Sequence, residues 1–293
     1  MSLTVLELCS RFLYRINEPL PASFSLVTGA DPGALQVKHI LIQVCEELRQ
    51  ARCFPQQKKT YQFTSTSGSR VSYPLPKDFY SPLLDTEYNS TTHLPLYNGS
   101  DADFAYRLNV IASSNYITAF RIFGSDANPN TAGGQFNVNP ALPSGQVGTY
   151  QYITKNLFLP PNWTPSTSIP ALSYRNVNGV NLFTTAGGTT STTPPTGAGI
   201  DGTVTWTLYD EAYETMLSDN DLCIFDDDLV ILGLRARWYE IKRYDGYENF
   251  VNEFLSKIEQ SVNRWKGTNR GSLTRYGTWN PRFRPATPGG WVY

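Results

Sequence analysis

The chain has little of the chemistry that metal and redox sites need. It has only two histidines, His39 and His93, and four cysteines, none of them in a CxxC pair. The cysteines are Cys9, Cys45, Cys53 and Cys223. A structural zinc site takes four histidine, cysteine or carboxylate ligands, so this composition argues against zinc, and no cofactor is expected. Scattered cysteines, two of them at apolar helical positions, predict buried free thiols in a protein made in a reducing cytoplasm.

Long apolar runs are absent as well. No stretch of about eighteen apolar residues occurs, so no transmembrane helix is expected. The first residues lack the basic-then-apolar layout of a secretory signal, and we expect none. The GxxxxGKS/T, GxSxG and HExxH motifs of nucleotide-binding and hydrolytic sites are also missing. These gaps predict a protein that is not an enzyme.

Two segments resemble ligand-binding motifs, but the residues or elements that such a site requires around the motif are missing. Gly197–Gly202 has the GxGxxG spacing, yet it leads into a predicted strand, whereas a dinucleotide site needs a helix N-terminus for the pyrophosphate. Asp219, Asp221 and the Asp226–Asp228 run suggest calcium, but the glycine and the final glutamate of an EF-hand are missing. We interpret the run as a helix cap followed by favourable charges in the first turn.

Charge is scarce along the chain and concentrated at its end. Charged residues make up 17% of the chain, and the formal net charge is −1. Arg264–Tyr293 holds six basic residues and no acidic one, which leaves about −7 on the rest of the chain. Large aromatic residues are interleaved with the basic ones, and three prolines with Gly289-Gly290 rule out a continuous helix.

We interpret this segment as an extended arm that orders on a partner. Arginine and large aromatic residues dominate the energetics of protein interfaces, whereas disordered tails are poor in aromatics. A disordered basic tail without a single partner is the alternative. The predicted docking residues are Arg264, Trp265, Lys266, Arg270, Arg275, Tyr276, Trp279, Arg282, Phe283, Arg284, Trp291 and Tyr293.

Apolar periodicity predicts helices at both ends of the chain. The first is expected at Leu3–Ile16, where Thr4 and Glu7 fit a capping box, and the second from Pro32 to about Arg52. The later helices are expected from Asp226 to the break at 245–246, and from Tyr247 to Trp265.

Between these helices the apolar period changes to that of strands. Tyr61 and Phe63, then Val71 and Tyr73, flank Thr66–Ser69 and predict a hairpin. Strict alternation over 204–208 predicts a strand with one buried face. The other expectations are strands at 115–123 and 147–153, a short helix at 101–108, and exposed loops at 124–134 and 184–202.

These elements predict an α+β protein. Residues 1–57 and 218–265 would pack as an antiparallel helical bundle, because short amphipathic helices need a partner surface. Residues 58–217 would form a large β-rich domain inserted between the two halves of the bundle. Residues 266–293 would form the extended arm.

The segment Tyr73–Phe79 reads YPLPKDF. It resembles the YPLPxDF signature of phage head-to-tail adaptor proteins, the tail tubular protein A-like connectors of short-tailed bacteriophages. The residues that carry the match are Tyr73, Pro74, Leu75, Pro76, Asp78 and Phe79.

Further segments resemble the same family in the same order along the chain. They are the central strand at 84–86, the turn at 94–96, the short helix at 101–108, the FRI hairpin at 119–123 and 136–143, the YEYISKN-like strand at 150–156, and the entry to the C-terminal helices at 219–238. The resemblance covers most of residues 1–265, while 157–217 departs from the family pattern as a long insertion.

The resemblance implies a structural virion protein at the head-tail junction, assembled in the host bacterial cytoplasm. Family members form a ring, usually of twelve copies, that joins the portal to the tail nozzle and takes part in virion assembly and genome ejection. The expected partners are the portal protein, tail nozzle or fibre proteins and other copies of the chain. Double-stranded DNA would pass through the channel without sequence-specific binding, and no membrane is involved.

Two other functions remain open on the residues alone. A Tyr- and Trp-rich β surface is typical of carbohydrate binding, which would fit a receptor-binding module of a tail fibre or tailspike. Glu211 and Glu214 could form the carboxylate pair of a cell-wall hydrolase. The helices at both ends and the basic arm favour the adaptor over both alternatives.

Overall fold

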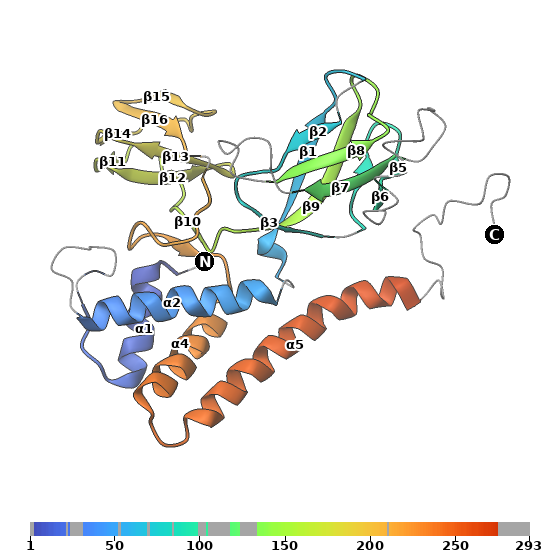
Figure 1. The fold of residues 1–293 in the computed structure, drawn as a ribbon. Helices are drawn as coiled ribbons and strands as arrows, with labels where there is room; N and C mark the ends of the chain where they lie inside the picture. The colour runs from blue at the N-terminus through green and yellow to red at the C-terminus, as the bar shows by residue number, and fades with distance from the viewer. Residues whose placement is uncertain are drawn as a thin grey trace. The chain divides into compact units, whose positions relative to one another are not determined.

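The computed structural model describes residues 3–21, 23, 32–51, 54–68, 71–83, 85–98, 104, 118–123, 134–209 and 211–274, the last ten by their backbone alone. Helices and several sheets make the protein α+β, as the sequence predicts. Two compact units are present (Figure 1): Met1–Gln57 with Lys155–Thr268 builds one, and Lys58–Thr154 is the body of the other. The insertion predicted at 58–217 is therefore divided, because its second part belongs with the helices.

The first unit begins with two helices whose ends follow sequence signals. α1 spans Val5–Ile16, and α2 spans Pro32–Gln50. The Thr4 hydroxyl accepts a hydrogen bond from the Glu7 backbone N–H, and the Glu7 carboxylate accepts one from the Thr4 N–H, at 3.2 and 3.0 Å. This reciprocal pair confirms the predicted capping box.

The later helices of this unit are α4, Asp227–Lys242, and α5, Tyr247–Thr274. The Asp226 side chain caps α4 by accepting a hydrogen bond from the Leu229 N–H, as predicted. α5 continues nine residues beyond its predicted end at Trp265, so 266–274 is helical and not extended. The prolines that rule out a helix begin only at Pro281, which leaves the preceding residues free to continue it.

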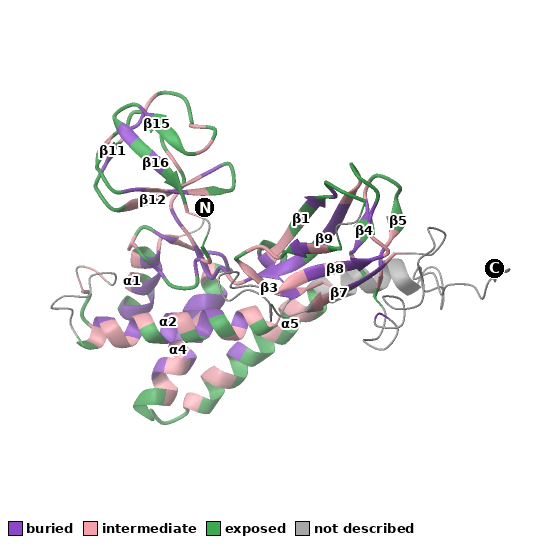
Figure 2. Cartoon of the chain, turned by 45° about the horizontal axis from the view of Figure 1, so that its top comes forward, coloured by how far each residue is buried: buried purple, intermediate pink, exposed green. Residues whose placement is uncertain are grey.

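Side chains from helices of both chain ends share one apolar core. α1 and α2 carry buried positions on one side and exposed ones on the other, whereas the middle of α4 has no exposed residue (Figure 2). Gly233 of α4 lies close to side chains of both α2 and α5, because a Cβ there would be 2.6 Å from Val44 and 2.8 Å from the Phe254 ring. The fully buried α-helical core residues are Val5, Leu8, Cys9, Phe12, Leu41, Val44, Cys45, Leu48, Val230, Leu234, Ala236 and Phe254.

Two short strands border this core, β10 at Phe158–Leu159 and β17 at Leu222–Cys223. The Sγ atoms of Cys45 and Cys223 are 3.5 Å apart, and these residues and Cys9 are buried free thiols, as predicted. Burial removes the water that would solvate a thiolate, and it raises the pKa of Cys45 well above its usual range. Cys53 lies outside the described residues.

The first unit also contains a small set of sheets. Their core is formed by Ile169, Val177, Leu182, Val204 and Trp206. The region 184–202, predicted as an exposed loop, supplies two of the strands and is held by buried polar groups. The strands are β12 (Ser173–Val177), β13 (Val180–Thr184), β16 (Val204–Leu208) and β15 (Gly199–Asp201) in sheet order, with β11 (Ser168–Ile169) paired to β14 (Gly188–Thr189).

Two sheets form the second unit, preceded in the chain by a 3₁₀ turn at Pro55–Gln57. One contains β1 (Lys58–Thr64), β9 (Val147–Thr154), β4 (Tyr88–Asn89) and β5 (Leu94–Pro95), with β3 (Phe79–Pro82) on β9. The other has the order β2 (Ser72–Pro74), β8 (Gln135–Asn139), β7 (Ala119–Phe123) and β6 (Tyr97–Asn98). All described pairings are antiparallel except β6 with β7.

The hairpin predicted around Thr66–Ser69 is wrong. β1 pairs with β9 and β2 pairs with β8, so the two neighbouring strands lie in different sheets. Their inward side chains meet instead of their backbones, because the rings of Phe63 and Tyr73 are 4.1 Å apart in the shared core. Each strand therefore pairs with a strand distant in sequence, and not with its neighbour across the local turn.

Aromatic side chains make up most of this second core. The rings of Phe136 and Tyr150 stack at 4.7 Å and 3°, and Phe120 stacks on the other side of Phe136 at 4.9 Å and 6°. Phe63 lies directly over Gly148, its partner on β9, where an added Cβ would be 2.2 Å from the ring. The glycine thus leaves room for an aromatic ring between the sheets.

Some expectations are not tested by the described residues. The predicted helix at 101–108, apart from Phe104, and the predicted loop at 124–134, apart from Gly134, lie outside them. Among the helices that are described, none is both long and apolar enough to cross a membrane.

Candidate interaction sites

The residues of the YPLPKDF segment connect β2 to β3 and belong to the folded core of the second unit. Tyr73 is 2% exposed and packs against Phe63, and Phe79 stacks on Tyr152 with ring centroids 5.6 Å apart. Pro74 is exposed, and Leu75 and Pro76 are half-buried between these two anchors. The segment is therefore held at both ends by aromatic packing.

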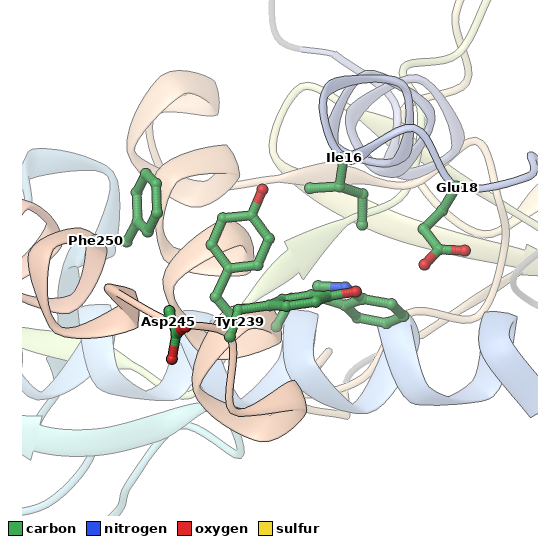
Figure 3. A pocket seen from close by; sticks show the side chains of 7 residues that line it. Ile16, Glu18, Tyr239, Asp245 and Phe250 are labelled. Carbon is green, nitrogen blue, oxygen red and sulfur yellow. The ribbon is translucent and has the colours of Figure 1, made fainter.

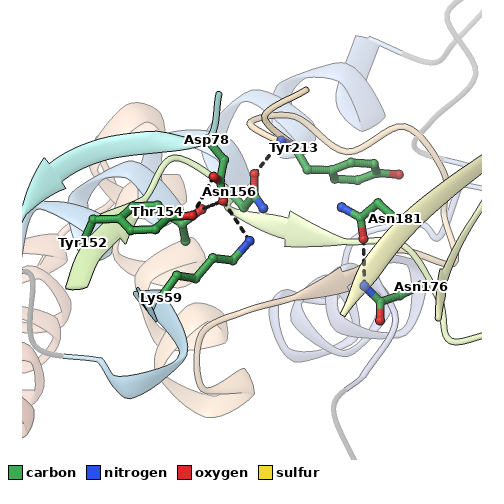
Figure 4. Close-up of polar contacts among 8 residues, drawn as sticks. All are labelled: Lys59, Asp78, Tyr152, Thr154, Asn156, Asn176, Asn181 and Tyr213. Carbon is green, nitrogen blue, oxygen red and sulfur yellow. Dashed lines mark hydrogen bonds and ion pairs between the residues drawn. The ribbon is translucent and has the colours of Figure 1, made fainter. Parts of the chain in front are cut away.

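Asp78 makes the main polar contacts of this segment (Figure 4). Its carboxylate accepts hydrogen bonds from Lys59 Nζ at 2.8 Å, the Tyr152 hydroxyl at 2.8 Å and the Thr154 hydroxyl at 2.7 Å. Burial alone would raise the pKa of Asp78, but the Lys59 charge and these hydrogen bonds outweigh it and hold the pKa below its ordinary value. Asp78 thus joins β1, β9 and the start of β3, a structural role.

The predicted docking arm begins inside α5. Arg264 is exposed on this helix, and the backbone at Trp265, Lys266 and Arg270 is helical. The remaining predicted docking residues lie outside the described residues: Arg275, Tyr276, Trp279, Arg282, Phe283, Arg284, Trp291 and Tyr293.

α5 packs on the helical core through one narrow stripe. Phe250, Phe254, Ile258 and Val262 recur every four residues, and all four contact the core. Only Phe254 is fully buried, and no described side chain beyond it on α5 is buried. The helix, 28 residues long in total, therefore makes its core contacts in its first part and continues to Thr274, where it leads into the basic, aromatic C-terminal segment.

A cavity of about 320 Å³ lies where the end of α1 meets the α4–α5 turn. In Figure 3 the Tyr239 ring lies between Phe250 and Ile16, with Glu18 and Asp245 at opposite ends. The complete lining is Ile16, Glu18, Trp238, Tyr239, Tyr244, Asp245 and Phe250. Four aromatic rings and two carboxylates therefore surround one opening.

Cations already occupy some of the ring faces beside this pocket. The Arg235 guanidinium carbon is 4.2 Å from the Phe250 centroid, and Lys242 Nζ is 4.8 Å from the Trp238 centroid. Such distances are within the range of cation–π attraction. Ile16, Trp238, Tyr239 and Phe250 lie in helices that the sequence predicts, but the pocket that they form was not predicted. The sequence feature that could have indicated this pocket is the high density of aromatic residues between Trp238 and Phe250.

The aspartates that suggested calcium have structural roles. Asp221 is fully buried and accepts hydrogen bonds from the Tyr213 hydroxyl and from the backbone N–H groups of Leu217 and Ser218, at 2.7–3.1 Å. Burial raises the pKa of Asp221 to about 6, against these hydrogen bonds. Asp226 caps α4. Within the described part of the chain, no group of three or more possible ligands could hold a metal ion.

Tyr213 is fixed from both ends of the residue. Its backbone N–H donates to Asn156 Oδ1 at 2.7 Å (Figure 4), and its hydroxyl donates to Asp221. Its ring makes edge contacts with Tyr174 and Tyr209 at 5.9 Å. Because Tyr174 and Tyr209 also pack against the helical core, this cluster joins the small sheets to the helices.

Asp201, in the GxGxxG-like segment, organises the small sheets. Its carboxylate accepts hydrogen bonds from the indole N–H groups of Trp163 and Trp206, at 2.7 and 3.1 Å, and from the Ser191 N–H at 2.8 Å. Burial opposes ionisation, but these donors outweigh it and lower the pKa of Asp201. The segment leads into β16 and not into a helix, which agrees with the rejection of a dinucleotide site.

Glu211 and Glu214, the carboxylates of the hydrolase alternative, do not line the cavity at the α4–α5 turn. Glu211 is exposed, and Glu214 forms an ion pair with Arg49 at 3.7 Å. Compared with known proteins, the chain matches no protein-family model and no curated protein.

Proposed function

We propose that this chain is a structural virion protein, the head-to-tail adaptor of a short-tailed bacteriophage. In this proposal a ring of copies, twelve in the family that the sequence resembles, joins the portal to the tail nozzle. The ring continues the DNA channel, and the protein is assembled in the host cytoplasm without a catalytic site or cofactor. Helices from both chain ends would form the ring wall as an antiparallel bundle, and the β-rich parts would contact nozzle or fibre proteins.

The observation that carries the proposal is the construction of α5. Phe254 anchors the helix in the core, no described side chain after it is fully buried, and the helix leads into a segment that has basic and aromatic residues but no acidic one. An isolated helix of this kind gains little stability in water without a packing partner. A portal ring with grooves between its subunits would supply that surface.

Charge supports the same assignment. The basic C-terminal thirty residues contrast with a body of about −7, which would repel rather than hold a DNA polyanion. A channel for DNA transit needs this property. A ring also presents many arms at once, so that weak individual docking adds up to tight binding.

Negative-stain imaging with the cognate portal ring tests the proposal. Full-length protein should form an additional ring stacked under the portal. A chain that ends at Thr274 keeps the whole of α5 and should lose this stacking. An arm variant with Arg282→Ala and Arg284→Ala should weaken stacking without affecting the fold, which circular dichroism would check.

The outcomes separate the adaptor from its alternative. Stacking that survives removal of 275–293 would show that the arm is not the docking element. No stacking by the full-length protein would refute the adaptor proposal. A glycan array would then test the carbohydrate-binding module of a tail fibre or tailspike.

A further inference from the structure

The α1–α4–α5 pocket, lined by the seven residues named above, combines aromatic walls with carboxylates that are not neutralised. Glu18 and Asp245 form no ion pair within the described part of the chain. The nearby Arg235 and Lys242 lie over ring faces instead. Tyr244 is 50% exposed at this pocket. A surface of this composition fits a ligand that brings both aromatic rings and cations.

The chain itself contains a segment of that composition. Residues 275–293 have three arginines and no acidic residue. Trp279–Arg284 is their densest stretch, with the sequence WNPRFR, in which two rings and two guanidinium groups are close together. Its rings match the apolar lining, and its arginines match Glu18 and Asp245.

The distance that the chain can span after Thr274 decides whether the segment can enter the pocket of its own molecule. Phe250 and Thr274 lie 24 residues apart on α5, which is roughly 36 Å at the rise of an α-helix. Trp279 follows Thr274 by five residues, a span of at most about 18 Å. Trp279 of the same chain therefore stays at least about 18 Å from Phe250, so a segment that places the Trp279 ring in the pocket has to come from another copy.

We propose that the α1–α4–α5 pocket binds Trp279–Arg284 of a second copy of this chain. The Trp279 ring enters between Tyr239 and the α1 end, and Arg282 and Arg284 pair with Glu18 and Asp245. Where each copy passes its segment on to the next, the contact is heterologous and generates a ring, or an open chain where the rotation does not close; a reciprocal exchange between two copies gives a dimer. This inference does not require portal binding, and the portal would compete for the same segment.

Charge reversal in the full-length chain tests the contact. Sedimentation velocity should show concentration-dependent association of the natural chain. The pocket variant Glu18→Lys/Asp245→Lys and the segment variant Arg282→Glu/Arg284→Glu should each weaken association by at least about tenfold. A chain that carries all four substitutions should recover association, because the charges are then exchanged.

The matched control is Glu253→Lys/Glu259→Lys, which reverses two exposed carboxylates of α5 outside the pocket and should leave association unchanged. Circular dichroism verifies that every variant is folded. A natural chain that stays monomeric at all concentrations would overturn the proposal. So would a pocket variant that associates normally, or a fourfold variant without recovery. Portal stacking that persists in the pocket variant would leave the adaptor function intact, so failures of the two proposals are distinguishable.

Discussion

At the scale of single residues, several side chains that look functional in the sequence are structural. Asp78 belongs to the YPLPKDF segment, yet its carboxylate accepts hydrogen bonds from Lys59, Tyr152 and Thr154. Asp201 holds two indole groups. Buried carboxylates with several donors stabilise one local geometry, because a lost donor leaves an uncompensated charge.

Gly148 gives a residue-scale prediction. Gly148→Ala places a methyl group 2.2 Å from the Phe63 ring and should lower the free energy of unfolding by about 1–3 kcal/mol, the usual cost of overpacking. Urea denaturation measures the change. Gly68→Ala is the control, since nothing lies within 4 Å of its Cβ position and little effect is expected. Equal stability of both variants would contradict the close contact.

At the scale of elements, local sequence signals determine where helices begin, and tertiary contacts determine how the helices pack. α1 starts where the Thr4–Glu7 box satisfies its first N–H groups, and α4 starts at its Asp226 cap. The position of α5 against α4 depends instead on Gly233, which has no side chain to hold the helices apart. Caps are local, whereas this contact joins three helices.

The capping box gives an element-scale prediction. Thr4→Ala removes the acceptor for the Glu7 N–H and should destabilise the first unit by about 1 kcal/mol. Thr4→Ser keeps the hydroxyl and should retain most of the stability. Thermal unfolding followed by circular dichroism compares the two variants. A Thr4→Ala chain as stable as the natural one would rule out a contribution from the cap.

The contact between α4 and α5 gives a second element-scale prediction. Gly233→Ala gains about 1 kcal/mol of helix propensity but meets Val44 and the Phe254 ring, so a net loss of about 1–2 kcal/mol is expected. Asn252→Ala, at an exposed position of α5, gains propensity without a new contact and serves as control. The expected order of urea midpoints is Asn252→Ala at or above the natural chain, and Gly233→Ala below it. A stabilised Gly233→Ala variant would refute the close packing.

At the scale of the whole molecule, each of the two units contains a buried carboxyl group whose pKa is raised, because burial disfavours its charged form. Glu87 is 5% exposed in the second unit, and burial raises its pKa to about 7 against the backbone hydrogen bonds that it accepts. Asp221 is its counterpart in the first unit, with a pKa of about 6. Both groups bind protons more tightly in the folded chain than in the unfolded chain.

Stability should therefore rise as the solution becomes mildly acidic. Between the ordinary pKa of Glu87, 4.5, and its folded value of about 7, the folded chain keeps a proton that the unfolded chain releases. The stabilisation is complete below this window and is lost as pH rises through it. Glu87→Gln should remove the Glu87 part of this dependence, leave the part due to Asp221, and raise stability above pH 7 by on the order of 2 kcal/mol. Urea midpoints measured from pH 5 to 8, a range set by these pKa values, test this. A midpoint of the natural chain that does not change with pH would contradict it.

The sequence by itself determined the local elements of this protein. Helix caps, the fourfold stripe of α5 and the alternation of β16 depend on neighbours within a few residues, and the structure reproduces them. The composition of the C-terminal segment is likewise plain in the sequence. Local hydrogen bonds and side-chain periodicity need no distant partner, which is why they could be predicted.

Tertiary structure alone decided the strand partners and the pocket. β1 could pair locally with β2, but the aromatic core places Phe63 over Gly148 of β9, more than eighty residues away. The pocket needs the end of α1 beside the α4–α5 turn, more than two hundred residues apart in sequence. Such contacts are selected by shared burial of side chains from distant segments, and no spacing within either segment records them.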